Sequence, residues 1–168
     1  NPERLKKMMY GKTSVFNQFT LEKEKVVNMF RQVLGEKLSS PAQYLFHGFL
    51  TSLIPSEVTE VLRVLVVDKK EGRIERAVLE GFAKSTAKKT IRNHDISAFS
   101  WTDFLFGREA YDNSLYDLVV PVEKKDHREV TKEILGCFHK TSILRTLDSQ
   151  KAVQDMKKEK VENLISLG

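Results

Sequence analysis

Two short apolar runs, about fifty residues apart, dominate the pattern of hydrophobic and polar positions. The first spans residues 62–67 and ends at Asp68, and the second spans residues 116–121. Apolar runs of this length are typical of strands covered on both faces, and their spacing leaves room for a helical crossover. Residues 43–48 form a third apolar segment, which predicts a buried strand that ends in a glycine turn. We therefore expect an α/β fold with a partial parallel sheet flanked by helices.

Apolar residues also recur at helical spacing in several segments. Thr20 is a good cap for an amphipathic helix that ends near residue 39, and Asp126 is a good cap for a helix through Leu135. We expect further helices at residues 2–9, from just after Asp68 to Gly81, from Ser85 to about Phe106, and at 149–167. Residues 139–147 are expected to be irregular.

Composition limits the class of protein. The 168 residues are 40% hydrophobic and 30% charged, which is enough for one domain with a core. We place that core at residues 1–136, followed by a linker and polar helix at 137–168. No segment is long and apolar enough to span a membrane and no signal peptide is visible, so we expect a cytoplasmic protein. The first residue is Asn1 and not methionine, which suggests a fragment of a longer chain.

The net charge of +5 is compatible with an anionic partner. Lysine and glutamate nevertheless alternate along the chain, which is typical of solvated helix faces, so nucleic-acid binding is not favoured. Cys137 is the only cysteine, so an intrachain disulfide is excluded and a reducing compartment fits. The sequence shows no cluster of histidines and cysteines at metal-binding spacing, and we predict no metal site.

The candidate chemistry lies just after the first apolar run. Arg73 and Arg76 are three residues apart, so a helix places them on one face beyond the carboxyl end of the strand. Open α/β sheets bind ligands at that edge, and guanidinium groups suit phosphate, so the pattern indicates an anion site. The alternative is that these arginines form surface ion pairs with Glu75, Glu80 or Asp95.

Three other features have a functional and a structural interpretation. His47 beside Gly48 is placed to face a ligand, although a histidine at a strand end is more often structural. Aromatic residues crowd residues 99–106 and are able to stack a base, although core packing is the stronger expectation. Residues 11–14 read Gly-Lys-Thr-Ser, but Lys6 occupies the position where a phosphate loop needs glycine, so we expect an ordinary loop.

Taken together, the segment from about residue 10 to residue 136 resembles the cytidylate-kinase-like family of P-loop phosphotransferases. The resemblance is carried by His47-Gly48-Phe49, Leu53-Ile-Pro55, Val61-Leu-Arg-Val64, Asp68 with Arg73, Ile91-Arg-Asn-His-Asp95, Trp101-Thr-Asp-Phe-Leu-Phe-Gly107 and Asp112-Asn-Ser-Leu-Tyr-Asp-Leu-Val119. The most specific part of the resemblance is an aspartate spaced to Trp101 and followed by the strand Tyr116-Asp-Leu-Val119. Residues 146–153 resemble an appendage from a bacterial branch of the family.

The resemblance implies a P-loop-kinase-like three-layer sandwich. It implies that Arg73, Arg76 and Arg92 from two lid arms are catalytic, because such kinases use arginines to stabilise charge on the transferred group. It implies that His47, Gly48 and Asp95 bind the substrate. ATP and Mg²⁺ would be cofactors only with a phosphate loop, which we expect to precede Asn1.

The sequence departs from the family pattern at two positions. Ala98 lies where the family usually has an arginine, and Phe49 follows Gly48 where a glycine–arginine pair is common. Loss of an arginine that acts on transition-state charge costs several orders of magnitude in rate. The resemblance therefore implies fold and ancestry more directly than activity.

Two functions remain open. The first is a nucleotide-binding domain that forms the lid and acceptor portion of a phosphotransferase and is inactive alone. The second is a non-catalytic regulatory or protein-interaction module that retains the kinase fold. The partner implied by the first is a nucleotide or phosphate anion, and self-association fits either.

Overall fold

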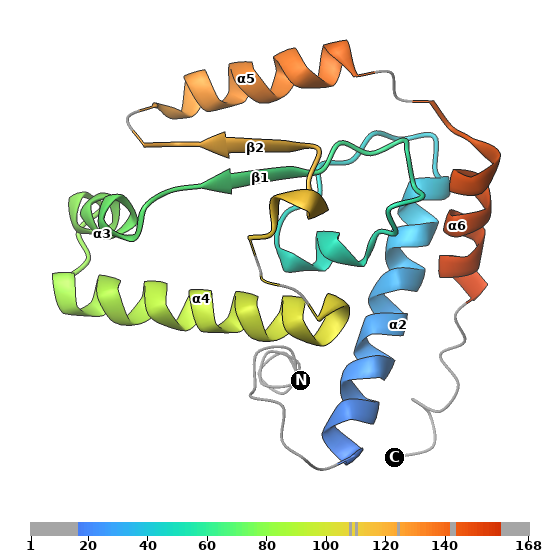
Figure 1. Cartoon of the computed structure of the whole chain (residues 1–168), viewed down its shortest axis with the longest axis horizontal. Coiled ribbons are helices and arrows are strands. Elements are labelled where there is room, and N and C mark those ends of the chain that lie inside the picture. Colours follow the sequence, from blue (N-terminus) through green and yellow to red (C-terminus); the bar gives the residue numbers. More distant parts are fainter. Residues whose placement is uncertain (1–16, 108, 110, 124, 142–143, 159–168) are drawn as a thin grey trace. The chain divides into compact units, whose positions relative to one another are not determined.

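The computed structural model describes residues 17–107, 109, 111–123, 125–141 and 144–158 (Figure 1). The chain divides into two compact units, one from residues 1–60 and 144–168 and the other from residues 61–143. The helix predicted at 2–9, the glycine-containing segment at 11–14 and the end of the last predicted helix lie outside the described residues.

The second unit contains the parallel strand pair. Strands β1 (Val64–Val67) and β2 (Leu118–Pro121) pair in parallel, with Val64 opposite Leu118. Backbone hydrogen bonds extend the pair at both ends: the Asp117 N–H donates to the Arg63 carbonyl at 2.9 Å, and the Val122 N–H donates to the Val67 carbonyl at 2.8 Å. The α/β class and the parallel pairing of these two runs are confirmed.

The strand predicted at residues 43–48 is wrong. Residues 43–47 have no regular secondary structure, and Leu45 is 97% exposed. Among the described residues, this segment makes no backbone–backbone hydrogen bond, so its apolar side chains lack the neighbouring strand that would bury them. The chain then turns at Gly48, whose φ of 101° favours glycine, and enters the 3₁₀ helix η1 (Phe49–Leu53).

Two helices follow β1, as predicted. Helix α3 (Lys70–Leu79) ends in a Schellman motif, in which the Gly81 and Phe82 N–H groups donate to the Val78 and Ala77 carbonyls. Helix α4 (Lys84–Phe106) packs on α3, and their shared core consists of Ile74, Ala77, Ala87 and Ile91. The predicted cap at Ser85 is wrong, because Ser85 lies inside the first turn of α4.

The second unit is completed by η2 (Asn113–Leu115) and helix α5 (His127–Lys140), which packs along β2 (Figure 1). The Asp126 carboxylate accepts hydrogen bonds from the Arg128 and Glu129 N–H groups, and the Glu129 side chain accepts one from the Asp126 N–H. This capping box confirms the predicted helix start. The helix continues to Lys140, so its predicted end at Leu135 is too early.

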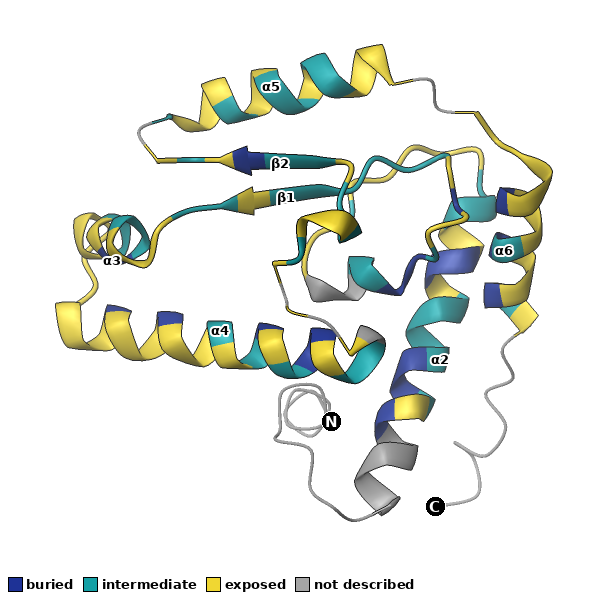
Figure 2. Ribbon diagram, in the orientation of Figure 1, coloured by how far each residue is buried: buried dark blue, intermediate teal, exposed yellow. Residues whose placement is uncertain are grey.

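The described α-helices of the first unit are α2 (Asn17–Ser39) and α6 (Leu147–Lys158), which pack against each other. Helix α2 begins three residues before the predicted cap at Thr20. Gly35 allows the close approach, because a Cβ there would lie 3.0 Å from Lys157 Cγ and 3.1 Å from Met156 Cβ. The buried apolar side chains of the two helices are Val26, Val27, Leu34, Val153 and Met156 (Figure 2).

Candidate site at the carboxyl end of β1

The site begins at Asp68, the residue that follows β1. Its side chain is only 5% exposed, and the Arg76 guanidinium of α3 donates to its carboxylate. The Lys69 N–H donates to Asp68 Oδ1 at 2.8 Å. Because Asp68 precedes the first turn of α3, its negative charge is also favoured by the positive end of the helix dipole. Asp68 therefore holds one guanidinium group at the end of the strand.

Gly72 makes this arrangement sterically feasible, and sequence reasoning missed it. A Cβ at position 72 would lie 2.6 Å from Asp68 Oδ2 and 3.1 Å from Asp68 Cγ. A glycine inside a helix is otherwise unfavourable, because it adds backbone entropy to the unfolded chain. The available signal was the isolated glycine within a helical pattern, which often marks a close approach.

Arg73 points to a different carboxylate. Its Nη1 donates to Oδ1 of Asp95 on α4 at 2.7 Å, and the Tyr111 hydroxyl donates to the same oxygen at 3.2 Å. The side chains of Arg73 and Asp95 are 29% and 23% exposed, so the pair is partly shielded from water. The sequence indicated Arg73 and Asp95 but not Tyr111, which lies in a segment without a periodic pattern.

Tyr111 titrates in an environment that favours the neutral phenol. Burial and the negative charge of Asp95 raise the pKa of Tyr111 above its ordinary value of 10.0, and the nearby Arg73 partly opposes this shift. The hydrogen bond to Asp95 acts in the same direction as burial, because a carboxylate accepts it only from the protonated hydroxyl. Tyr111 is therefore a hydrogen-bond donor at neutral pH.

The aromatic residues predicted as a cluster separate into two environments. Trp101 is 1% exposed and lies beside Phe104 with ring centroids 6.4 Å apart, so the expected core packing holds for it. Phe99 is 44% exposed and meets Tyr111 edge to face, with ring centroids 5.7 Å apart and an interplanar angle of 80°. The side chain of Phe106 lies outside the described ones.

The other predicted site residues are placed elsewhere. Arg92 is exposed on α4, three residues before Asp95, and forms no ion pair within the described part of the chain. His47 and Gly48 belong to the first unit, where the Gly48 carbonyl accepts hydrogen bonds from the backbone and hydroxyl of Thr51. The structure thus brings Arg73 and Asp95 together, and the roles of Arg92, His47 and Gly48 stay predictions.

Both arginines of α3 retain donors for a ligand. The ion pairs use Nη1 of Arg73 and Nη2 of Arg76, whereas a guanidinium carries five N–H donors. Position 98 contributes nothing to such a site, because Ala98 is 0% exposed within the core. The ion-pair alternative expected from the sequence is thus confirmed for Arg73 with Asp95, whereas Arg76 pairs with Asp68 and not with Glu75 or Glu80.

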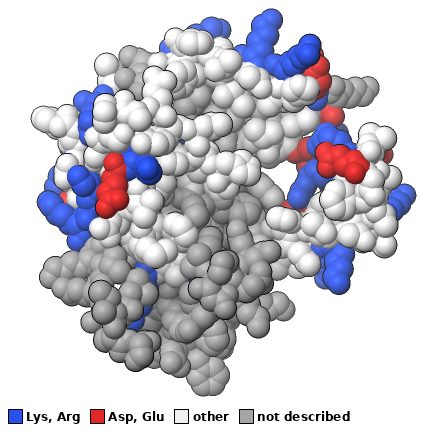
Figure 3. Space-filling view, turned by 180° about the vertical axis from the view of Figure 1, so that it is seen from behind, with Lys and Arg blue, Asp and Glu red and all other residues white. Residues whose placement is uncertain are grey.

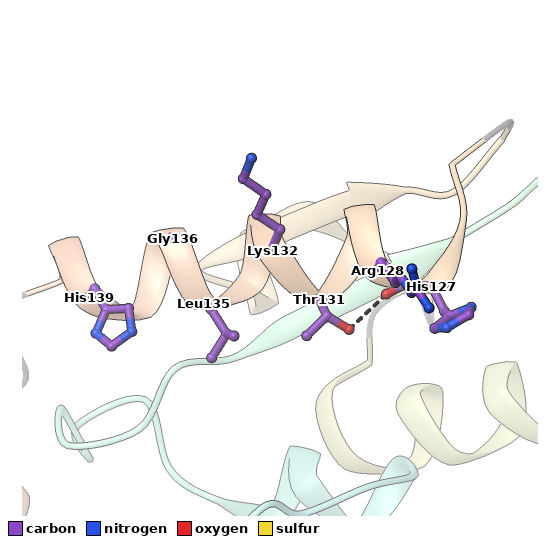
Figure 4. Close-up of a pocket in the computed structure, with 7 residues that line it drawn as sticks. All are labelled: His127, Arg128, Thr131, Lys132, Leu135, Gly136 and His139. Atoms are coloured by element: carbon purple, nitrogen blue, oxygen red, sulfur yellow. Dashed lines mark hydrogen bonds between the residues drawn. The ribbon is translucent and has the colours of Figure 1, made fainter.

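The surface outside this site has less of the character of a binding site. Figure 4 shows a hollow whose lining residues all come from α5, with Leu135 between Thr131 and His139, so a single helix borders it and it is open to solvent. On the face drawn in Figure 3, acidic side chains lie beside several of the lysines and arginines. The described residues contain no cluster of metal-ligating side chains, and no described helix is long and apolar enough to cross a membrane.

Comparison with known proteins places this geometry in context. The model of the cytidylate kinase-like family matches residues 3–124, a range that includes β1, α3, α4 and β2. No curated protein and no solved structure matches the chain. The match therefore covers all the residues of the Asp68–Arg76 and Arg73–Asp95–Tyr111 groups.

Proposed function

The chain belongs to the cytidylate kinase-like family, and we propose on that premise that it forms the lid and acceptor portion of a nucleoside monophosphate phosphotransferase. Arg73 and Arg76 bind the phosphate of the acceptor nucleotide, and Arg92 adds a third positive charge from α4. Asp68 and Asp95 orient the two guanidinium groups of α3.

One observation carries the proposal: two adjacent turns of α3 direct arginines to carboxylates from separate elements, at the carboxyl end of β1. Phosphoryl transfer leaves little covalent work to the protein, so catalysis depends on positioning and on stabilising charge. Ion-paired guanidinium groups are already oriented before the ligand binds, and they donate to phosphate in a bidentate fork.

The donor side of the reaction needs a further element. Kinases of this type hold the donor phosphates with a glycine-rich loop and a lysine, and the sequence has Lys6 where the first glycine of such a loop would be. We propose that a segment upstream of Asn1 supplies this loop, and that ATP and Mg²⁺ bind only with it. The 168 residues alone should then transfer phosphate from ATP to CMP far below the ~1–100 s⁻¹ typical of kinases.

The second candidate is a regulatory or protein-interaction module without catalytic activity. The observation that favours it is Ala98, which is fully buried at the position where the family resemblance implies an arginine. An arginine at a buried position would bring an unpaired charge into the core, so this side of α4 is built for packing.

Calorimetric titration separates the two candidates. CMP, ATP and sulfate are titrated into the wild type and into Arg73→Ala/Arg76→Ala. Arg128→Ala/Lys132→Ala, which removes two positive charges from exposed positions on α5, is the matched control. We expect the wild type and the control to bind CMP alike and the α3 variant to bind it at least about tenfold more weakly. Equal binding by all three proteins, or no binding by the wild type, favours the interaction module.

A further inference from the structure

We propose that Phe99 and Tyr111 form a stacking surface for the base of the bound nucleotide. The inference rests on the proposed function, because the base is placed there by a phosphate held at Arg73. No stacking role follows from the family match itself, and the two rings come from separate parts of the chain, one on α4 and the other after its end at Phe106.

The first support is the separation of the two faces of α4. The buried face consists of Ala87, Ile91, Ala98, Trp101 and Thr102, as Figure 2 shows for the helix as a whole. Phe99 lies on the other face, one turn after Asp95, and is 44% exposed. The neighbouring Ile96 is 42% exposed. Exposed apolar side chains therefore lie beside the Arg73–Asp95 ion pair. They are outside the face of α4 that packs on α3.

The second support is that the rings are held in place. The Tyr111 hydroxyl donates to Asp95 Oδ1, which also accepts from Arg73. Phe99 meets the Tyr111 ring edge to face, an arrangement that aromatic pairs prefer and that leaves ring faces uncovered by the partner. The aromatic pair, the acidic side chain and the guanidinium are thus one connected group within the second unit.

This combination matches the chemistry of a nucleotide. A base presents a flat π face that stacks on aromatic rings largely irrespective of base identity, and its phosphate is recognised by arginine. The exposed Phe138 on α5 offers a contrast, because it also meets a ring edge to face, that of His139, but is not connected to an ion pair. The Phe99–Tyr111 pair, in contrast, is joined to the Arg73 guanidinium through the Asp95 carboxylate.

The test separates the base from the phosphate. CMP, ribose 5-phosphate and cytidine are titrated by NMR into the wild type, Phe99→Leu, Phe99→Tyr and the control Phe138→Leu. We expect CMP to bind the wild type about 5- to 150-fold more tightly than ribose 5-phosphate does, which is the range for stacking of one base. Phe99→Leu, which leaves only the Tyr111 ring, should reduce this difference without changing the affinity for ribose 5-phosphate. Phe99→Tyr, which keeps the ring, and Phe138→Leu should behave as the wild type.

The outcomes distinguish the two proposals. If ribose 5-phosphate binds as tightly as CMP to the wild type, or if Phe99→Leu weakens both ligands equally, the stacking surface is wrong while the phosphate site stands. If ribose 5-phosphate does not bind, the proposed phosphate site is wrong. The titration with cytidine then tests the stacking surface by itself. Cytidine binding that Phe99→Leu weakens supports the surface, and its failure to bind the wild type contradicts it. Thermal unfolding of each variant checks that it remains folded.

Discussion

Asp68 and Gly72 depend on each other at the scale of single residues. The Asp68 carboxylate lies over the first turn of α3, where any side chain at position 72 would contact it. The same carboxylate orients Arg76, while Asp95 orients Arg73. Residue type and spacing singled out Arg73 and Arg76, and the family resemblance pointed to Asp95. The sequence did not identify Gly72 or Tyr111, because their roles depend on contacts with other elements.

Gly72→Ala should destabilise the protein although alanine is the better helix former. The intrinsic helix preference favours alanine by about 0.5–1 kcal/mol, but the new Cβ would displace a buried carboxylate from Arg76 and from the Lys69 N–H. We expect a net loss of about 1 kcal/mol in the free energy of unfolding, measured by urea denaturation. In an Asp68→Ala background the same change should be neutral or stabilising. A loss of equal size in both backgrounds would contradict the account.

Asp95→Asn should lower the pKa of Tyr111 relative to the wild type. Burial remains in the variant, but the carboxylate charge that favours the neutral phenol is removed, so the phenol ionises at a lower pH. An NMR titration of the Tyr111 ring resonances measures this shift. Asp103→Asn, at an exposed position on the same helix, is the control and should leave the pKa unchanged. An unchanged pKa in Asp95→Asn would show that the contact is not maintained in solution.

At the scale of elements, the sequence correctly predicted the helices whose caps, ends and periodicity depend on neighbouring residues. The Asp126 cap, the break at Gly81 and the helical periodicity of α2 and α4 all depend on residues within a few positions of one another. The strand prediction at residues 43–48 failed because an apolar run forms a strand only if another strand pairs with it. The sequence of the run does not specify that partner. The pairing of β1 with β2 was predictable because a crossover of suitable length separates them.

Gly35→Ala and Gly136→Ala should have opposite effects on stability. A Cβ at position 35 would lie 3.0 Å from Lys157 Cγ and 3.3 Å from the Lys157 backbone nitrogen, so the neighbouring atoms of α6 must shift by a few tenths of an ångström. We expect a loss of about 1–3 kcal/mol in the free energy of unfolding. A Cβ at position 136 of α5 meets nothing within 4 Å, and the better helix propensity of alanine should add about 0.5–1 kcal/mol. Chemical denaturation measures both, and a neutral Gly35→Ala would contradict the close packing.

At the scale of the whole molecule, the two units differ in what their sequences reveal. The second unit contains the strand pair and the ion pairs of Arg73 and Arg76, all within the range that the family model matches. The first unit joins residues 1–60 to residues 144–168, and this pairing of distant segments was not predictable from periodicity. It is fixed by contacts such as the hydrogen bond from the Ser149 hydroxyl to Glu60, which are specific only in three dimensions.

The central claim is that Arg73 and Arg76 bind the phosphate of a nucleotide, and the signals of their own side chains test it most directly. The Nε–H resonances of the arginines are recorded by ¹H–¹⁵N NMR while CMP is added, and they are assigned with the single Arg73→Lys and Arg76→Lys variants. We predict that the resonances of Arg73 and Arg76 shift with one common saturation curve, while that of Arg128 on α5 does not move. Shifts confined to other arginines, or saturation by CMP with the Arg73 and Arg76 signals unchanged, would contradict the account.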